Sequence, residues 1–197
     1  RRLVGSEMCI RDRLYMKYKP YLMKDVLDGE AQEKFRVIST FAGGGGSSTG
    51  YRLAGGKILA INEFVEEARN TYKDNYPNTP ILDGDIKELD GKDFLEIANI
   101  KEGELELLDG SPPCSAFSMC GTLAREGTVH SDGFGKTKSY SDGKIVTNIE
   151  DLFFEFLRVA DKIRPKTIIA ENVEGLTVGE AKQYFNKIQN TFEDIGY

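Results

Sequence analysis

The sequence predicts an α/β fold in which a mostly parallel sheet carries helices on both faces. Short apolar runs rich in β-branched residues alternate with helical patterns from Phe35 onward. Polar or glycine-rich loops follow these runs, and repeated strand–helix alternation is typical of a parallel sheet. Of the 197 residues, 40% are apolar and 29% are charged, which excludes a disordered chain and suffices for one domain with its own core.

The elements follow one another in a regular order along the chain. A glycine-rich turn separates the first strand from the first helix, and one long irregular stretch covers residues 121–148. A further helix is expected over 152–163, because its apolar residues recur at a spacing of 3.6. The expected strands are 35–41, 57–62, 81–82, 104–110 and 166–170, and the other expected helices are 65–75, 94–100 and 180–195.

Charge and cysteine content narrow the function classes. Twenty-six basic and 32 acidic residues give a net charge of −6, which is no signature of a nucleic-acid-binding surface but leaves room for a local basic face. Cys9, Cys114 and Cys120 form neither a disulfide framework nor a paired metal motif. No apolar run reaches the roughly 20 residues of a membrane-spanning helix, and no signal peptide is visible. We therefore expect a protein of a reducing, cytoplasmic compartment that binds no membrane.

The ends of the chain read differently from its middle. Residues 1–13 hold four arginines without helical or strand periodicity. They resemble translated sequencing-adapter read-through, and a genuine basic arm is the alternative interpretation. We expect residues 1–34 to be an N-terminal extension and residues 35–197 to be the folded domain. The helix over 180–195 runs into Gly196 and Tyr197, a pattern that usually leads into another strand, so a continuation of the protein is expected.

The first two post-strand loops have the composition of a nucleoside site. Ligands of parallel α/β sheets bind beyond the carboxyl ends of the strands. The glycine-rich loop after Phe41 matches neither the phosphate-binding nor the dinucleotide-binding glycine pattern. A nucleoside ligand without a pyrophosphate is still compatible with it. Glu63 could accept hydrogen bonds from both ribose hydroxyls, and Phe64 could stack on a base. The alternatives are a flexible glycine linker and a solvated acid at a helix start.

The later loops carry candidate recognition and catalytic groups. Asp85 could accept from an amino group beside Ile86, although a plain Asp-Gly turn explains the same residues. Two prolines direct the chain into Cys114, which suits a nucleophile, whereas a buried structural cysteine is the alternative. Glu171 follows the last strand and could exchange a proton in a closed pocket. The lone His130 lies in the irregular stretch, where a solvated role is expected.

Taken in order, these loops resemble the DNA (cytosine-5) methyltransferase family over about residues 35–197. Residues 41–50 resemble its first cofactor motif, and Pro112-Pro113-Cys114 its catalytic motif. Glu171-Asn172-Val173 resembles the second catalytic motif, and 152–155 the helix that follows the mobile catalytic loop. The resemblance implies a Rossmann-like S-adenosylmethionine-dependent fold with Cys114 and Glu171 as catalytic residues. It also implies that the cofactor is held by Phe41, Ala42, Gly43, Gly44, Gly46, Glu63, Phe64, Asp85, Ile86, Pro112 and Leu152.

The implied reaction is methyl transfer to C5 of a cytosine flipped out of duplex DNA. Addition of the Cys114 thiolate to C6 would turn the ring into an enamine, and Glu171 would share a proton with N3. C5 would then take the methyl group of S-adenosylmethionine, leaving S-adenosylhomocysteine, without a metal ion. Loss of the C5 proton would eliminate Cys114. The stretch over 121–148 is a candidate lid over the flipped base.

The sequence also departs from the family pattern. A Gln-x-Arg-x-Arg element, a target-recognition region and a late segment that completes the cofactor pocket do not occur in the 197 residues. We therefore expect double-stranded DNA to be bound mainly by this absent C-terminal region and the isolated chain to be nearly inactive. The complete enzyme is expected to be a monomer of the bacterial or phage-type cytoplasm, associated with the nucleoid and with restriction–modification. A tRNA cytosine-5 methyltransferase and an inactive cofactor-binding fragment remain alternatives.

Overall fold

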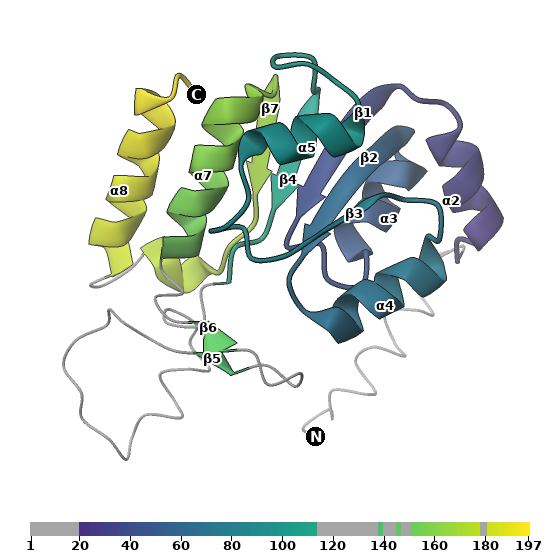
Figure 1. Cartoon of the computed structure of the whole chain (residues 1–197), viewed down its shortest axis with the longest axis horizontal. Coiled ribbons are helices and arrows are strands. Elements are labelled where there is room, and N and C mark those ends of the chain that lie inside the picture. The colour runs from purple at the N-terminus through teal and green to yellow at the C-terminus, as the bar shows by residue number, and fades with distance from the viewer. Residues whose placement is uncertain (1–19, 114–137, 140–144, 147–150, 178–180) are drawn as a thin grey trace, which may run out of the picture.

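Five parallel strands form the central sheet. The computed structural model describes residues 20–113, 138–139, 145–146, 151–177 and 181–197 (Figure 1). Neighbouring strands lie in the order β3-β2-β1-β4-β7, so the chain moves outward from β1 in both directions. A ligand site is expected at such a reversal of strand order. The strands are β1 (Phe35–Thr40), β2 (Gly56–Glu63), β3 (Ile81–Asp83), β4 (Leu107–Gly110) and β7 (Thr167–Ala170).

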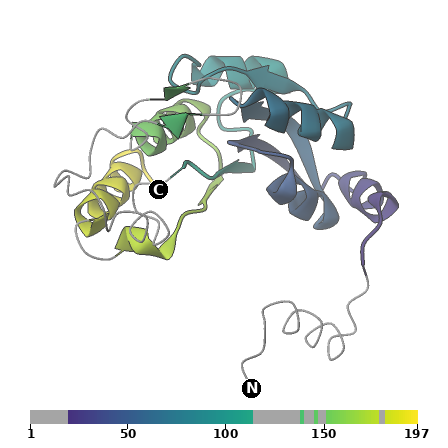
Figure 2. The ribbon, with the colours of Figure 1, turned by 90° about the horizontal axis from the view of Figure 1, so that it is seen from below.

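Helices cover both faces of this sheet, as the alternation of buried side chains along the strands requires. Val37 and Leu107 point into one apolar cluster and their neighbours Ile38 and Leu108 into another. Helices α2, α3 and α4 cover the first cluster, and α5, α7 and α8 cover the second, so that α2 and α8 lie at opposite sides of the molecule in Figure 2. Their bounds are Met23–Glu30, Gly46–Leu53, Glu66–Asn75, Gly91–Ala98, Asp151–Ile163 and Ala181–Asp194.

An irregularity in the pairing of β1 with β2 adjusts this alternation. Val37 pairs with Ile58, but the next residue, Ile38, pairs with Ala60, which leaves Leu59 as an extra residue. Such a bulge turns every later side chain of the strand towards the face opposite to the one that regular alternation would give. As a result Ile58 and Ile61 face the same apolar cluster although they are three residues apart.

The predicted α/β fold is confirmed, with a few differences in the elements. β4 begins at Leu107 instead of residue 104, because Lys101 and Glu104 close a turn through a 3.1 Å backbone hydrogen bond. Helix α2 was not expected from the sequence. This helix approaches α3 so closely that a Cβ on Gly29 would lie 2.2 Å from the backbone oxygen of Arg52. Further elements outside the prediction are η1 (Glu174–Thr177) and the antiparallel pair β5 (Lys138–Ser139) and β6 (Ile145–Val146).

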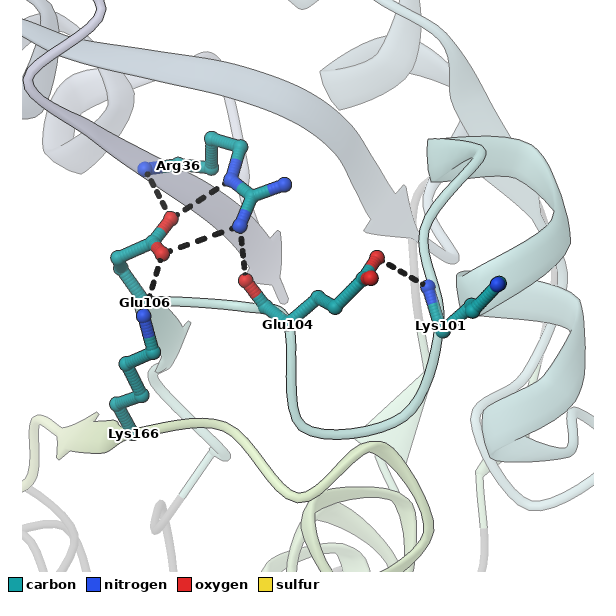
Figure 3. Close-up of polar contacts among 5 residues, drawn as sticks. All are labelled: Arg36, Lys101, Glu104, Glu106 and Lys166. Atoms are coloured by element: carbon teal, nitrogen blue, oxygen red, sulfur yellow. Dashed lines mark hydrogen bonds and ion pairs between the residues drawn. The ribbon is translucent and has the colours of Figure 1, made fainter.

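A charged cluster joins three strands at the amino end of the sheet (Figure 3). Glu106 accepts hydrogen bonds from the backbone nitrogen of Arg36 at 3.1 Å and from its Nε at 2.7 Å. Lys166, just before β7, donates to the same carboxylate at 2.9 Å. The Arg36 side chain also donates to the carbonyl oxygen of Glu104. These contacts, the Arg36 hydrogen bond foremost, lower the pKa of Glu106 from 4.5 to about 2.

We expect Glu106→Gln to lower the free energy of unfolding at pH 7 by about 1–2 kcal/mol, since the partly exposed partners screen the interaction. A lowered folded-state pKa stabilises the protein above pH 4.5, and this contribution is lost as the pH falls towards about 2. Urea unfolding at pH 7 and pH 3 should therefore show a smaller pH dependence for the variant. Glu102→Gln, at an exposed site of the same turn, is the matched control. Equal pH dependence in the variant and the unmodified protein would contradict the assignment.

The described helices contain none that combines the length and apolar character needed to cross a bilayer. Within the same described ranges, no group of three or more His, Cys, Asp or Glu side chains has the geometry of a metal site.

Candidate functional site

The loops that follow the strands enclose a cavity of about 240 Å³ at the carboxyl edge of the sheet. Its walls are mostly apolar and carry a few polar groups, the usual composition of a small-molecule site. The volume lies just below the usual range for drug-sized ligands and suits a nucleoside. The lining residues are Phe41, Asn62, Glu63, Phe64, Val65, Ala68, Asp85, Ile86, Ser111, Pro113 and Leu152.

Glu63 is the polar centre of this cavity. It ends β2 and is only 8% exposed. Its Oε2 accepts a hydrogen bond from the backbone nitrogen of Gly43 at 2.8 Å, and its Oε1 accepts one from that of Val65 at 2.7 Å. Each carboxylate oxygen keeps a second acceptor position. The fixed carboxylate can therefore accept two hydroxyl groups from one ligand, as a ribose would offer.

The glycine-rich loop is shaped as much by α4 as by space for a ligand. A Cβ at Gly44 would lie 3.1 Å from the Thr71 side chain, and one at Gly45 would lie 3.0 Å from the ring of Tyr76. Gly43 has a φ of +54° and no atom within 4 Å of the place where its Cβ would sit. Phe41, on the cavity wall, has a φ of +52°, a strained conformation for a residue with a side chain. The open space is thus at Gly43 and at Gly46, the first residue of α3.

Arg69 of α4 fixes the end of β2. Its side chain donates to the carbonyl oxygens of Glu63 and Phe64 at 3.1 and 2.6 Å, and lies 2.8 Å from a carboxylate oxygen of Asp83 at the end of β3. Asn62 adds a second link, because its buried amide donates to the carbonyl oxygens of the β3 segment at 2.9 and 3.1 Å. The carboxyl ends of β2 and β3 are therefore held together.

Arg158 of α7 holds the third loop from the other face of the sheet. Its guanidinium donates to the carbonyl oxygens of Ile86 and Leu89 at 2.9 and 2.7 Å. The Asp85 carboxylate accepts from the backbone nitrogen of Lys87 at 3.0 Å, which closes the turn. Because α7 also supplies Leu152 to the cavity, Arg158 fixes the loop relative to that wall.

The proline turn lies beside the cavity and next to β7. The Glu171 backbone nitrogen donates to the carbonyl oxygen of Gly110 at 3.0 Å, and the Asn172 amide donates to that of Pro112 at 3.5 Å. Glu171 is exposed at this edge. The description of the turn ends at Pro113, so Cys114 and most of the candidate lid over 121–148 lie outside the described residues. The structure thus brings Glu171 next to the turn that leads into Cys114.

The structure gathers six of the eleven expected cofactor residues around the cavity: Phe41, Glu63, Phe64, Asp85, Ile86 and Leu152. Pro113, and not Pro112, lies on the wall, since the buried Pro112 directs its carbonyl oxygen to Asn172. The expected residues away from the lining are Ala42, Gly43, Gly44, Gly46 and Pro112. Lining residues outside that expectation are Asn62, Val65, Ala68, Ser111 and Pro113, and adjacency to the motifs was the available signal for them.

Comparison with known proteins gives a consistent result. The family model described as C-5 cytosine-specific DNA methylase matches residues 35–197. The type II methyltransferase M.Eco47II of Escherichia coli is 33% identical over 163 residues, which are 83% of this chain and 33% of that protein. M.NgoPII of Neisseria gonorrhoeae is 29% identical over 162 residues, 82% of this chain and 40% of that protein. The chain therefore spans about a third to two fifths of these relatives.

Solved structures agree on the fold. A crystal structure of a putative DNA modification methyltransferase encoded within an Escherichia coli prophage aligns with a TM-score of 0.60 at 22% identity. The alignment covers 82% of this chain and 38% of that one. Spodoptera frugiperda DNMT2 aligns with a TM-score of 0.53 at 21% identity, covering 82% of this chain and 41% of that one. The Rossmann-like methyltransferase fold is therefore confirmed.

Proposed function

Because the chain belongs to the C-5 cytosine-specific DNA methylase family, we propose that it forms the cofactor-binding and catalytic part of a DNA cytosine-5 methyltransferase. The observation that carries this proposal is the cavity beside the proline turn. It combines apolar walls with the Glu63 carboxylate, and Glu171 lies at the same sheet edge. A nucleoside-sized site next to a nucleophile-bearing turn suits methyl transfer to a base.

The residues around the cavity fit S-adenosylmethionine, which supplies an electrophilic methyl group on a sulfonium sulfur when bound. In this proposal Glu63 accepts the ribose hydroxyls, and Asp85 with Ile86 receives the adenine. Phe41 and Leu152 contribute apolar wall, and Gly43 leaves room at the loop backbone. The two carboxylates also favour a ligand with a positive centre.

The chain's own residues carry the base chemistry. The Cys114 thiolate forms a bond to C6 of the cytosine, which moves electron density to C5. Glu171 holds N3 and shares its proton as that charge develops. After C5 has been methylated, water takes up the C5 proton, the C5–C6 double bond forms again, and the bond between C6 and sulfur breaks to release the Cys114 thiolate. A base inside a duplex is out of reach of both side chains, so the cytosine must be flipped outward.

The wider arrangement follows from the same proposal. Residues 35–197 are the cofactor-binding portion, and α2 packs on it from the preceding segment. Most contacts to double-stranded DNA belong to parts of the enzyme that correspond to the unmatched length of the relatives. We place the complete enzyme in the bacterial cytoplasm, as a monomer acting at the nucleoid within restriction–modification.

Covalent trapping on a duplex containing 5-fluorocytosine tests the function, because fluorine at C5 prevents release of the thiolate. We expect an S-adenosylmethionine-dependent adduct with the product of the whole reading frame and complete loss of the adduct in Cys114→Ala. Cys120→Ala is the matched control and should keep the adduct. An adduct formed on tRNA and not on DNA would overturn the choice of substrate. Cofactor binding without any adduct would reduce the protein to a binding module.

A further inference from the structure

A buried carboxylate outside the cavity lining connects the two halves of the proposed site. Asp109 of β4 is 6% exposed. Its Oδ2 accepts a hydrogen bond from the Ser39 hydroxyl at 2.8 Å, and its Oδ1 accepts one from the Tyr51 hydroxyl at 2.9 Å. Among the described residues, no basic side chain forms an ion pair with it. A buried acid satisfied by two hydroxyls alone is costly and calls for a role.

The two hydroxyls come from opposite sides of the cofactor loop. Ser39 lies in β1, two residues before Phe41, and Tyr51 lies in α3 after the glycines. Both hydroxyls donate to the same carboxylate, so Asp109 links the segment before the cofactor loop to the helix after it. Burial raises the pKa of Tyr51 well above its ordinary range, which keeps its hydroxyl a donor.

Asp109 also lies in β4, just before the proline turn that leads into Cys114. Its own carbonyl oxygen accepts from the Thr40 hydroxyl at 3.1 Å, and the next residue, Gly110, accepts from the Glu171 backbone at 3.0 Å. Burial raises the pKa of Asp109, and the charge of Glu171 adds to the rise. Asp109 is therefore close to both the cofactor loop and Glu171, and it lies outside the cavity lining.

We propose that Asp109, held by Ser39 and Tyr51, is a positioning residue that couples the cofactor loop to the turn before Cys114. This inference rests on the proposed function. If the coupling exists, removing a hydroxyl from the carboxylate loosens the loop and the turn together. If Asp109 had only a structural role, removing a hydroxyl would lower the stability of the protein. It would not change ligand affinity or the hydrogen bond between Glu171 and Gly110 beyond that general loss of stability.

Binding of S-adenosylhomocysteine to the product of the whole reading frame, measured by calorimetry, is the first readout. We expect Tyr51→Phe to weaken binding about 5- to 10-fold, in the range of typical coupling between sites. Thr79→Val is the matched control, because it removes a hydroxyl that accepts a hydrogen bond from the buried Arg52 at 2.7 Å. Thr79 precedes β3, at the edge of the sheet opposite the cavity. This control should lower the melting temperature similarly and change affinity less than about twofold.

Hydrogen exchange of the Glu171 amide is the second readout and needs no ligand. We expect about tenfold faster exchange in Tyr51→Phe and in the milder Ser39→Ala, and no change in Thr79→Val. The double variant Tyr51→Phe with Asp109→Asn should weaken binding less than the product of the single effects.

The two readouts separate failure of the inference from failure of the proposed function. If the unmodified chain binds S-adenosylhomocysteine and Tyr51→Phe binds equally well with unchanged exchange, the positioning role is overturned. If the unmodified chain does not bind it, the proposed cofactor site fails, and the exchange data alone decide whether Asp109 couples loop and turn.

Discussion

Replacing Glu63 with Gln should weaken binding of S-adenosylhomocysteine by about 30- to 100-fold, equivalent to about 2–3 kcal/mol for a lost charge-assisted contact. The carboxylate now accepts from Gly43 on one oxygen and from Val65 on the other. A glutamine would turn an NH2 group towards one of these two N–H groups. The backbone N–H of Gly43 or of Val65 would then lose its acceptor, and the ribose would lose one of its two hydrogen-bond acceptors.

Calorimetric titration of the product of the whole reading frame with S-adenosylhomocysteine measures this effect. Glu66→Gln is the matched control, since it removes an exposed carboxylate three residues further along at the start of α4. The control should bind within about twofold of the unmodified chain. An affinity for Glu63→Gln equal to that of the control would show that the ligand lies elsewhere.

The sheet could be predicted from the sequence because its strands are short apolar runs separated by strong turn residues. Parallel pairing then follows from the intervening helices, and the carboxyl edge follows from parallel pairing. The bulge at Leu59 could not be predicted, since nothing in the run 57–62 marks an extra residue. The same is true of α2, whose position depends on the close approach of Gly29 to α3.

At the site, the side chains that end strands could be predicted, whereas the residues that hold them could not. Glu63 is the last residue of β2 and Asp85 lies two residues after β3, so their position was fixed by the topology. Arg69 and Arg158 lie inside helices, and their role depends on which carbonyl oxygens the tertiary structure brings near. Gly44 is one of the predicted cofactor residues, and its missing side chain also leaves room for Thr71, as that of the neighbouring Gly45 does for Tyr76.

Gly110→Ala should place a severely destabilising methyl group in the described core. Its Cβ would lie 2.6 Å from Phe156 Cε2 and 2.6 Å from the Thr40 hydroxyl. Phe156 is completely buried, and it is confined further by edge-on contact with the ring of Phe153. Neither neighbour can move without displacing β1 or α7. We expect a loss of about 3 kcal/mol or more in the free energy of unfolding, the upper range for overpacking.

Gly50→Ala provides the opposite case within the same chain. Gly50 lies in α3 with an ordinary backbone conformation, and no atom lies within 4 Å of its missing Cβ. Alanine there should raise the free energy of unfolding by about 0.5–1 kcal/mol through helix propensity. Urea unfolding should therefore show changes of opposite sign in the free energy of unfolding of the two variants. The carbonyl oxygen of Gly110 also accepts a hydrogen bond from the Glu171 backbone nitrogen. If Gly110→Ala lowered the free energy of unfolding only slightly, the turn before Cys114 would be able to move independently of β4. Such a result would contradict the coupling through Asp109.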